Sequence, residues 1–194
     1  MIKNIIFDFD GVIHDTFEIG YSTNKELDKS ITKEEYKDFF NGNLYKHIKI
    51  KPKNYNLFFD IAEKKYKGLI IENEIKKELL KLKKKYRLFI ITSTKESILK
   101  NYFHENNLKD LFNEIFGFET HTSKEEKFKI LFKKYNISNE DCIFITDTLG
   151  DILEANKIGV KSIAVDYGFH DAERLKKGNP IKIISHIREI EGLL

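Results

Sequence analysis

The sequence predicts an α/β protein with a doubly wound parallel sheet and a small helical cap inserted after the first strand. Three observations support this prediction. Six short runs rich in Ile, Phe and Val alternate with amphipathic helical segments over most of the 194 residues. The runs are apolar on both faces, a pattern typical of parallel strands that helices cover on two sides. Between residues 16 and 68 no convincing strand occurs, and the pattern there is helical.

The elements of the sheet region follow in order along the chain. Strands are predicted at residues 4–9, 87–92, 114–118, 142–146, 161–165 and 180–184. Helices are predicted at residues 74–84, 95–105, 124–135, 151–158 and 185–193. The alternation favours right-handed crossovers and a doubly wound sheet. Three signals mark helix starts: hydroxyl caps at residues 92–94 before the helix at 95–105, a capping box of Ser123 with Glu126 before the helix at 124–135, and a cap at Asp151. Gly159 marks a left-handed end of the helix at 151–158.

The chain divides into two predicted parts. Residues 1–15 and 69–194 are expected to form the sheet-bearing core. Residues 16–68 are expected to form the cap, with helices near residues 18–29, 33–40 and 55–66. The stretches around Gly42 and Pro52 separate these helices, because Gly, Asn and Pro interrupt regular structure.

The composition excludes several classes of protein. The net charge is +3, from 34 Lys and Arg against 31 Asp and Glu, and only three of the cations are Arg. Because Arg is the side chain best suited to paired contacts with bases and phosphates, a nucleic-acid partner is not expected. The single cysteine, Cys142, rules out an internal disulfide and a multi-cysteine zinc site. No apolar run approaches the roughly 18 residues that span a bilayer and no signal peptide is evident, so a cytoplasmic protein without membrane contact is expected.

Three carboxylates follow the first predicted strand, in the segment DFDGVIHD at residues 8–15. In an extended strand Asp8 and Asp10 would point to the same side, and Gly11 would let the chain turn sharply. Ligands bind at the carboxyl ends of strands in open α/β sheets, and paired carboxylates attract a hard cation such as Mg²⁺. Taken alone, the pair is equally well explained by a surface turn.

Asp147 and Asp151 follow the predicted strand at residues 142–146 in the same way. By themselves they are also explained as a turn residue and a helix cap. Two acidic strand ends in one parallel sheet make a metal site the stronger interpretation.

Phosphate-binding candidates follow two other predicted strands. Thr92 and Ser93 offer hydroxyl groups beside the amides of a helix N-terminus, which is a good cradle for phosphate. The simpler explanation is helix capping. Lys124 begins the next helix and would neutralise phosphate oxygens. Lys127 lies one turn further on and remains an alternative, although Lys124 is nearer to the strand ends.

In this order the motifs resemble those of the haloacid dehalogenase superfamily: DxDGVxxD at residues 8–15, Thr92, Lys124, and DxxxD at residues 147–151. The resemblance covers the sheet region, and the first motif, with its apolar lead-in at residues 5–7, is the most specific part. The position of the insertion resembles the phosphoglycolate phosphatase-like and β-phosphoglucomutase-like branch. One departure is Thr146, which stands where many relatives have Gly.

The resemblance implies a role for each matching residue. Asp8 would be the nucleophile that forms an aspartyl-phosphate, and Asp10 the general acid and base. Mg²⁺ would be the cofactor, held by the Asp8 carboxylate, the main-chain carbonyl of Asp10 and Asp147, with Asp151 close by. The phosphate-binding residues would be Thr92, Ser93 and Lys124.

The expected function is a Mg²⁺-dependent phosphatase that hydrolyses a small phosphorylated metabolite. An acid at Asp10 favours phosphoryl transfer, since dehalogenases of the family lack it. Gly20 occupies the position where β-phosphoglucomutase-like enzymes carry a cap histidine, which counts against a mutase. Two alternatives stay open: a phosphomutase of that type, and a non-catalytic phosphate- or partner-binding protein on the same fold.

The sequence leaves the substrate, the oligomeric state and the specificity residues undetermined. The aromatic cap would supply the docking surface of a partner-binding protein, although packing of the cap itself explains its Phe residues better. Candidate specificity residues of the cap are Tyr21, Lys46, His47, Lys49 and Tyr55.

Overall fold

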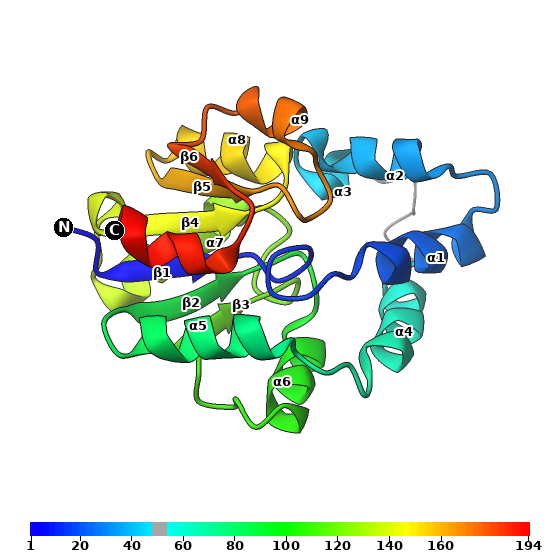
Figure 1. The fold of residues 1–194 in the computed structure, drawn as a ribbon. Coiled ribbons are helices and arrows are strands. Elements are labelled where there is room, and N and C mark those ends of the chain that lie inside the picture. Colours follow the sequence, from blue (N-terminus) through cyan, green and yellow to red (C-terminus); the bar gives the residue numbers. More distant parts are fainter. Residues whose placement is uncertain (48–53) are drawn as a thin grey trace.

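A single parallel sheet organises the molecule (Figure 1). The computed structural model describes residues 1–47 and 54–194. All strand pairs are parallel, in the order β3-β2-β1-β4-β5-β6. The predicted fold class is confirmed. The strands are β1 (Asn4–Phe7), β2 (Arg87–Ile91), β3 (Glu114–Phe116), β4 (Cys142–Thr146), β5 (Lys161–Val165) and β6 (Lys182–Ile184).

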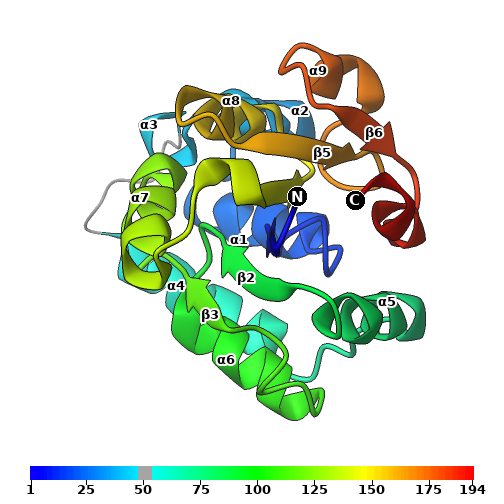
Figure 2. The ribbon, with the colours of Figure 1, turned by 90° about the vertical axis from the view of Figure 1, so that its left-hand side faces the viewer.

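Helices cover both faces of this sheet (Figure 2). Strand residues such as Ile5 and Ile90 bury one face, and their neighbours Ile6 and Phe89 bury the other. This explains why the runs are apolar throughout, since successive side chains alternate between two covered faces. The first face carries α5 (Asn73–Lys83), α6 (Glu96–Glu105) and the 3-10 helix η4 (Ile187–Leu193). The second carries α7 (Lys124–Tyr135), α8 (Leu149–Lys157) and the short α9 (Ala172–Lys176).

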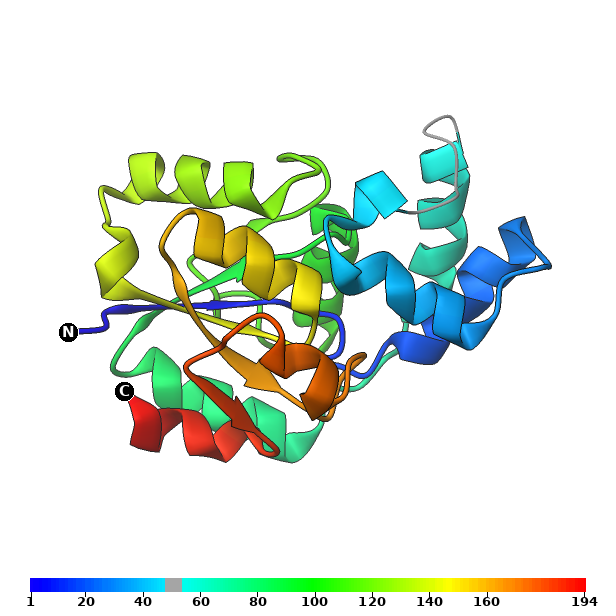
Figure 3. The same cartoon turned by 90° about the horizontal axis from the view of Figure 1, so that it is seen from above.

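The segment between β1 and α5 is helical in its described residues. Its helices are grouped beyond the carboxyl ends of the strands (Figure 3). Lys49 and Pro52 lie outside the described residues. The division into core and cap domains remains a prediction. The elements are α1 (Phe17–Leu27), α2 (Lys33–Asp38), the 3-10 helix η1 (Phe39–Asn41), α3 (Leu44–His47) and α4 (Tyr55–Tyr66).

Aromatic side chains hold this segment together and join it to the sheet region. Tyr36 and Phe39 are buried in a cluster with Phe169, which comes from the loop after β5. Phe59 is buried and Phe58 partly buried against the main core. These contacts agree with the packing explanation of the aromatic residues.

Three predicted helix caps are wrong. The side chain of Ser123 does not cap α7 and instead donates to Glu154, at 2.9 Å. α8 begins at Leu149 and is capped by Thr148, so Asp151 lies inside its first turn. The hydroxyls of residues 92–94 do not cap α6, because the carboxylate of Glu119 accepts from the N–H of Glu96 at 2.7 Å. The left-handed backbone at Gly159 was predicted correctly, with φ at 70°.

Candidate active site

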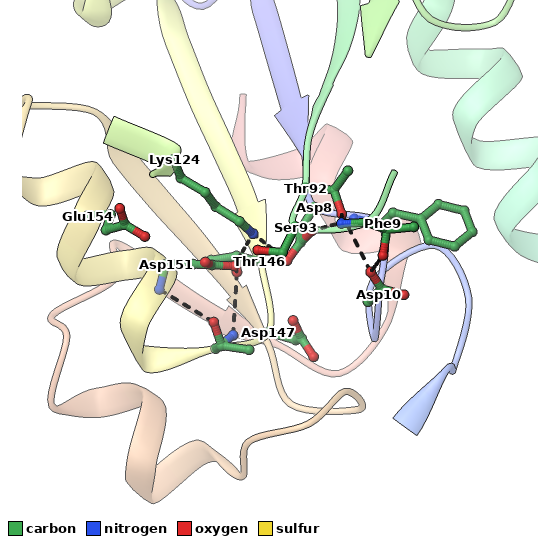
Figure 4. A network of polar contacts seen from close by, with 12 residues as sticks. Asp8, Phe9, Asp10, Thr92, Ser93, Lys124, Thr146, Asp147, Asp151 and Glu154 are labelled. Carbon is green, nitrogen blue, oxygen red and sulfur yellow. Dashed lines mark hydrogen bonds and ion pairs between the residues drawn. The ribbon is translucent and has the colours of Figure 1, made fainter. Parts of the chain in front are cut away.

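The loop after β1 separates the first two acidic side chains. β1 ends at Phe7, before either aspartate, so the expectation that Asp8 and Asp10 share one side of an extended strand is wrong. Phe9 is fully buried between them. The Asp8 carboxylate faces α7 and α8, whereas the Asp10 carboxylate faces the start of the cap (Figure 4).

Asp8, Asp147 and Asp151 form a buried carboxylate cluster, with one oxygen atom from each lying within 4.8 Å of the others. The Lys124 ammonium bridges two of them, donating at 2.6 Å to an oxygen of Asp8 and at 2.6 Å to an oxygen of Asp151 (Figure 4). The structure thus brings together residues that are up to 143 positions apart in the sequence.

Burial dominates the electrostatics of the cluster. It raises the pKa of Asp8 well above the usual range, although Lys124 opposes the shift. It raises the pKa of Asp147 to about 8, against the effect of a hydrogen bond from the Phe169 N–H. At Asp151 burial acts in the same direction, but Lys124 and several hydrogen bonds outweigh it and lower the pKa. The cluster therefore takes up protons when no further positive charge is present.

The cluster fits a divalent cation. Three carboxylates face one ammonium, which leaves two formal negative charges when all are ionised. Oδ1 of Asp147 is buried and has no hydrogen-bond partner within the described part of the chain. An unpaired buried oxygen is costly, and a metal ion would satisfy it. An all-oxygen set of this kind suits Mg²⁺.

Gly11 is required by this arrangement. Its backbone φ is 73°, in the left-handed region, and a Cβ there would lie 1.9 Å from Oδ2 of Asp147. Only glycine allows the loop after β1 to approach the acidic end of β4 so closely.

Asp10 is surrounded by hydroxyl groups. Thr16 donates to Oδ1 and Thr94 to Oδ2, each at 2.7 Å, and Thr92 lies further away at 3.4 Å. Tyr66, the last residue of α4, also donates to Oδ1. Four donors on two oxygens fix the carboxylate in one orientation. The sequence had indicated none of Thr16, Thr94 and Tyr66 as partners of Asp10, because Thr94 comes from the loop after β2 and Tyr66 from the end of α4, far along the chain.

Lys124 and Lys127 occupy different environments. Lys127 is fully buried, and its ammonium donates to the carbonyl oxygen of Thr92 at 2.5 Å. Burial and the nearby Lys124 lower the pKa of Lys127 to about 7. Of the two lysines, Lys124 contacts the aspartates and Lys127 donates to the backbone just after β2. The role of Lys124 as the phosphate-binding lysine stays a prediction.

A small cavity of about 30 Å³ opens at the acidic cluster. Most of the predicted site residues line it, whereas Thr92 and Asp147 are buried behind its wall. Glu154 also lines it and accepts a hydrogen bond from Asn43 of the cap at 3.1 Å. Glu154 is a neighbour that no sequence motif singled out. The predicted residues in the lining are Asp8, Asp10, Ser93, Lys124 and Asp151.

The family of haloacid dehalogenase-like hydrolases matches residues 5–165, which include the loop after β1, α7 and the end of β4. The chain belongs to this family. No helix within the described residues is long and apolar enough to cross a membrane.

Curated relatives carry the names of phosphate-releasing enzymes. A protein of Caldanaerobacter subterraneus named "Putative pyrophosphatase PpaX" is 26% identical over 92% of this chain and 88% of its own length. A 5'-nucleotidase of Pseudomonas aeruginosa is 31% identical over 43% of this chain and 39% of its own. Phosphoglycolate phosphatase 1 of the same species is 28% identical over 52% of this chain and 38% of its own. In the last two the match spans less than half of the relative.

Solved structures share the whole fold. A predicted phosphatase from Clostridium acetobutylicum is 22% identical, with a TM-score of 0.80 over all of this chain and 98% of the other. At this level of identity the likeness shows the fold, and the chemistry has to be argued from the site itself.

Proposed function

We propose that this protein is a Mg²⁺-dependent phosphatase that hydrolyses a small phosphomonoester through an aspartyl-phosphate on Asp8. The observation that carries the proposal is the convergence of Asp8, Asp10 and Lys124 on one cavity beside a carboxylate cluster. The names of the relatives, which describe the release of phosphate from esters or anhydrides, support the same reaction class.

Each side chain takes one part in the proposed reaction. The carboxylate of Asp8 attacks phosphorus, and the bond from phosphorus to the leaving oxygen breaks. Protonated Asp10 gives its proton to that oxygen, and the alcohol departs. In the second half Asp10 accepts a proton from water, whose oxygen attacks phosphorus and releases Asp8 together with inorganic phosphate.

Positive charge in the site comes from Lys124 and from the cofactor. Lys124 lies at the Asp8 carboxylate and would offset the charge that develops on the phosphate oxygens. Asp8, Asp147 and Asp151 would hold Mg²⁺ with the main-chain carbonyl of Asp10, and the ion would reduce the repulsion between Asp8 and the incoming phosphate. Ser93 and Thr92 would complete the phosphate site at the end of β2.

The geometry around Gly20 favours hydrolysis over phosphomutase activity. A Cβ on Gly20 would lie 2.1 Å from the hydroxyl oxygen of Tyr36, so a histidine side chain does not fit there in this arrangement. The cap therefore lacks room for the acid and base group that mutases place at this position.

The test is phosphate release from p-nitrophenyl phosphate with and without Mg²⁺. Asp8→Asn should lower kcat by at least about a thousandfold, because it removes the nucleophile. Asp15→Asn is the matched control, since Asp15 is an exposed aspartate of the same loop whose carboxylate accepts from the Phe17 N–H. Equal loss in both variants, or turnover that persists in Asp8→Asn, would contradict the proposal.

A further inference from the structure

A second cavity of about 70 Å³ adjoins the first and lies between the cap and the sheet. The two cavities share the walls formed by Asp10, Ser93 and Phe169. In the proposed reaction Asp10 protonates the leaving oxygen, so the cavity on its far side is where the leaving alcohol would sit. What lines this cavity then defines the alcohol that the site accepts.

The described lining is mostly apolar and aromatic, its neutral polar members include Thr16, Asn24, Ser93 and Thr94, and Asp10 is its only charged residue. It contains no Lys, Arg or His among the residues that the structure describes. Lys95 lies near one wall, but its ammonium is placed over the ring of Phe59, at 5.0 Å from the ring centre, and does not line the cavity. The main apolar contributions come from Ile19, Phe40, Leu44, Tyr55, Phe58 and Phe59.

Tyr36 gives this cavity a polar group that lacks a partner. The side chain is 4% exposed, and its hydroxyl forms no hydrogen bond with any described residue. The hydroxyl lies over Gly20, which also lines the cavity. Because Gly20 has no side chain, the Tyr36 hydroxyl can occupy the space that a Cβ would fill. Burial raises the pKa of the phenol, as do the charges of Asp10 and Asp147, so the group stays neutral and able to donate.

We propose that the leaving group of the substrate is an uncharged alcohol with an apolar face, and that Tyr36 donates a hydrogen bond to it. The proposal rests on the proposed phosphatase function and specifies its substrate class. The Tyr36 hydroxyl has no partner among the described residues and lies next to Gly20 in the cavity wall, so an acceptor on the leaving group would supply one.

An anionic leaving group fits this cavity poorly. A carboxylate or second phosphate would enter a mostly apolar space beside Asp10, and none of the described lining residues is a cation that would pair with it. An unpaired charge in such surroundings is strongly disfavoured. The described lining therefore separates this chain from those relatives whose names specify phosphoglycolate or pyrophosphate.

The test compares substrates that are matched in shape and differ in charge. With Mg²⁺ and the whole chain, kcat/KM is measured for 2-phosphoglycolate and its neutral isostere 2-phosphoglycolamide, and for 4-carboxyphenyl and 4-carbamoylphenyl phosphate. Each neutral ester should exceed its carboxylate partner by at least about tenfold. Equal values, or a preference for the carboxylates, would overturn the proposal.

Tyr36→Phe tests the hydrogen bond separately from the shape of the cavity. It should lower kcat/KM for 2-phosphoglycolamide by about threefold to tenfold, while that for n-propyl phosphate, which lacks an acceptor beyond the ester oxygen, changes less than about twofold. Tyr21→Phe is the matched control, because Tyr21 packs near Tyr36 but its hydroxyl bonds Lys25 and the Ile31 carbonyl outside the cavity. An unchanged ratio of the two substrates in Tyr36→Phe would contradict the assignment.

The two proposals fail in different ways. Loss of Asp8-dependent turnover with every ester would contradict the phosphatase function itself. Asp8-dependent turnover that favours anionic esters would leave that function intact and overturn only the substrate class.

Discussion

At the scale of single residues, Thr146 changes the chemistry of the last acidic motif. Its hydroxyl donates to Oδ2 of Asp151 at 2.7 Å, at the end of β4. This threonine therefore adds a hydrogen bond to a buried carboxylate that also pairs with Lys124. Hydrogen bonds to charged groups are among the stronger ones in proteins.

Thr146→Val should reduce the free energy of unfolding by about 2 kcal/mol, because it removes this donor and keeps the shape of the side chain. Thr146→Ser keeps the hydroxyl and loses only a buried methyl group, with an expected cost of about 1 kcal/mol. Urea unfolding of both variants measures the difference. A valine variant as stable as the serine variant would show that the hydrogen bond contributes nothing net.

Lys127 is the buried cation whose protonation the fold opposes. Its ammonium donates a hydrogen bond to the Thr92 carbonyl. It also interacts electrostatically with Lys124, Asp8, Asp151 and Glu154. Burial lowers its pKa to about 7 in the folded protein, against 10.5 for an ordinary lysine. Between these two pH values the unfolded chain therefore binds more protons than the folded protein. Lys127 lowers the free energy of unfolding by its full amount below pH 7, and this destabilisation disappears as the pH rises toward 10.5.

The stability of the wild type should consequently rise with pH relative to that of Lys127→Met. The slope of the difference is expected to approach about 1 kcal/mol per pH unit between pH 7.5 and 9.5. Chemical unfolding of both proteins at a series of pH values, without Mg²⁺, isolates the effect because the other titrating groups are common to both. Parallel stability curves would mean that Lys127 titrates normally.

At the scale of elements, the short helix α3 joins the cap to the sheet region. Asn43, just before it, donates to Glu154 of α8, and the Tyr45 hydroxyl donates to the carbonyl of Ser93 at 2.8 Å. The backbone approaches equally closely, since a Cβ on Gly150 would lie 2.2 Å from the carbonyl oxygen of Gly42. These contacts join the cap to α8 and to the loop after β2, beside both cavities.

Tyr45→Phe should weaken this closure without disturbing the core. One neutral hydrogen bond is worth about 1 kcal/mol, so KM for p-nitrophenyl phosphate should rise about fivefold with little change in the unfolding midpoint. Tyr135→Phe removes a hydroxyl that contacts Glu114, far from the cap, and should leave KM unchanged. The same KM in both variants would show that the contact does not control substrate retention.

At the scale of the whole molecule, the acidic cluster joins the ends of β1 and β4 with α7 and α8. The stability of this cluster depends on positive charge that balances its three carboxylates. Removal of divalent ions should therefore lower the melting temperature of the entire domain, and Mg²⁺ at a hundred times its Kd should restore about 2.7 kcal/mol.

Thermal unfolding with EDTA and with increasing Mg²⁺ measures this stabilisation. Asp147→Asn should abolish the Mg²⁺-dependent shift, because it changes the carboxylate whose Oδ1 has no protein partner among the described residues. Asp15→Asn, with an exposed carboxylate, should keep the shift. A shift that survives in Asp147→Asn would place the ion elsewhere.

The sequence by itself determined the fold class and most of the elements. Strands that are apolar on both faces and alternate with helices predict a parallel sheet with helices on both sides, because each apolar face must be covered. All six strands and four α-helices of the sheet region were predicted to within about two residues at each end; the strand at residues 87–92 and the helix at 124–135 are examples. α3 and α9 were missed because four and five residues carry no periodic pattern.

Only the tertiary structure decided the partners of the polar side chains. The sequence identified Asp8, Asp10, Lys124, Asp147 and Asp151 as one group, but it assigned Thr94 and Ser123 to helix caps. Side-chain oxygens bind whichever donor or acceptor is nearest, and here the nearest groups come from other elements. Tyr66 on Asp10 arises because the cap folds back onto the sheet, and Tyr36 over Gly20 arises because α1 and α2 lie together within the cap. No local pattern encodes either contact.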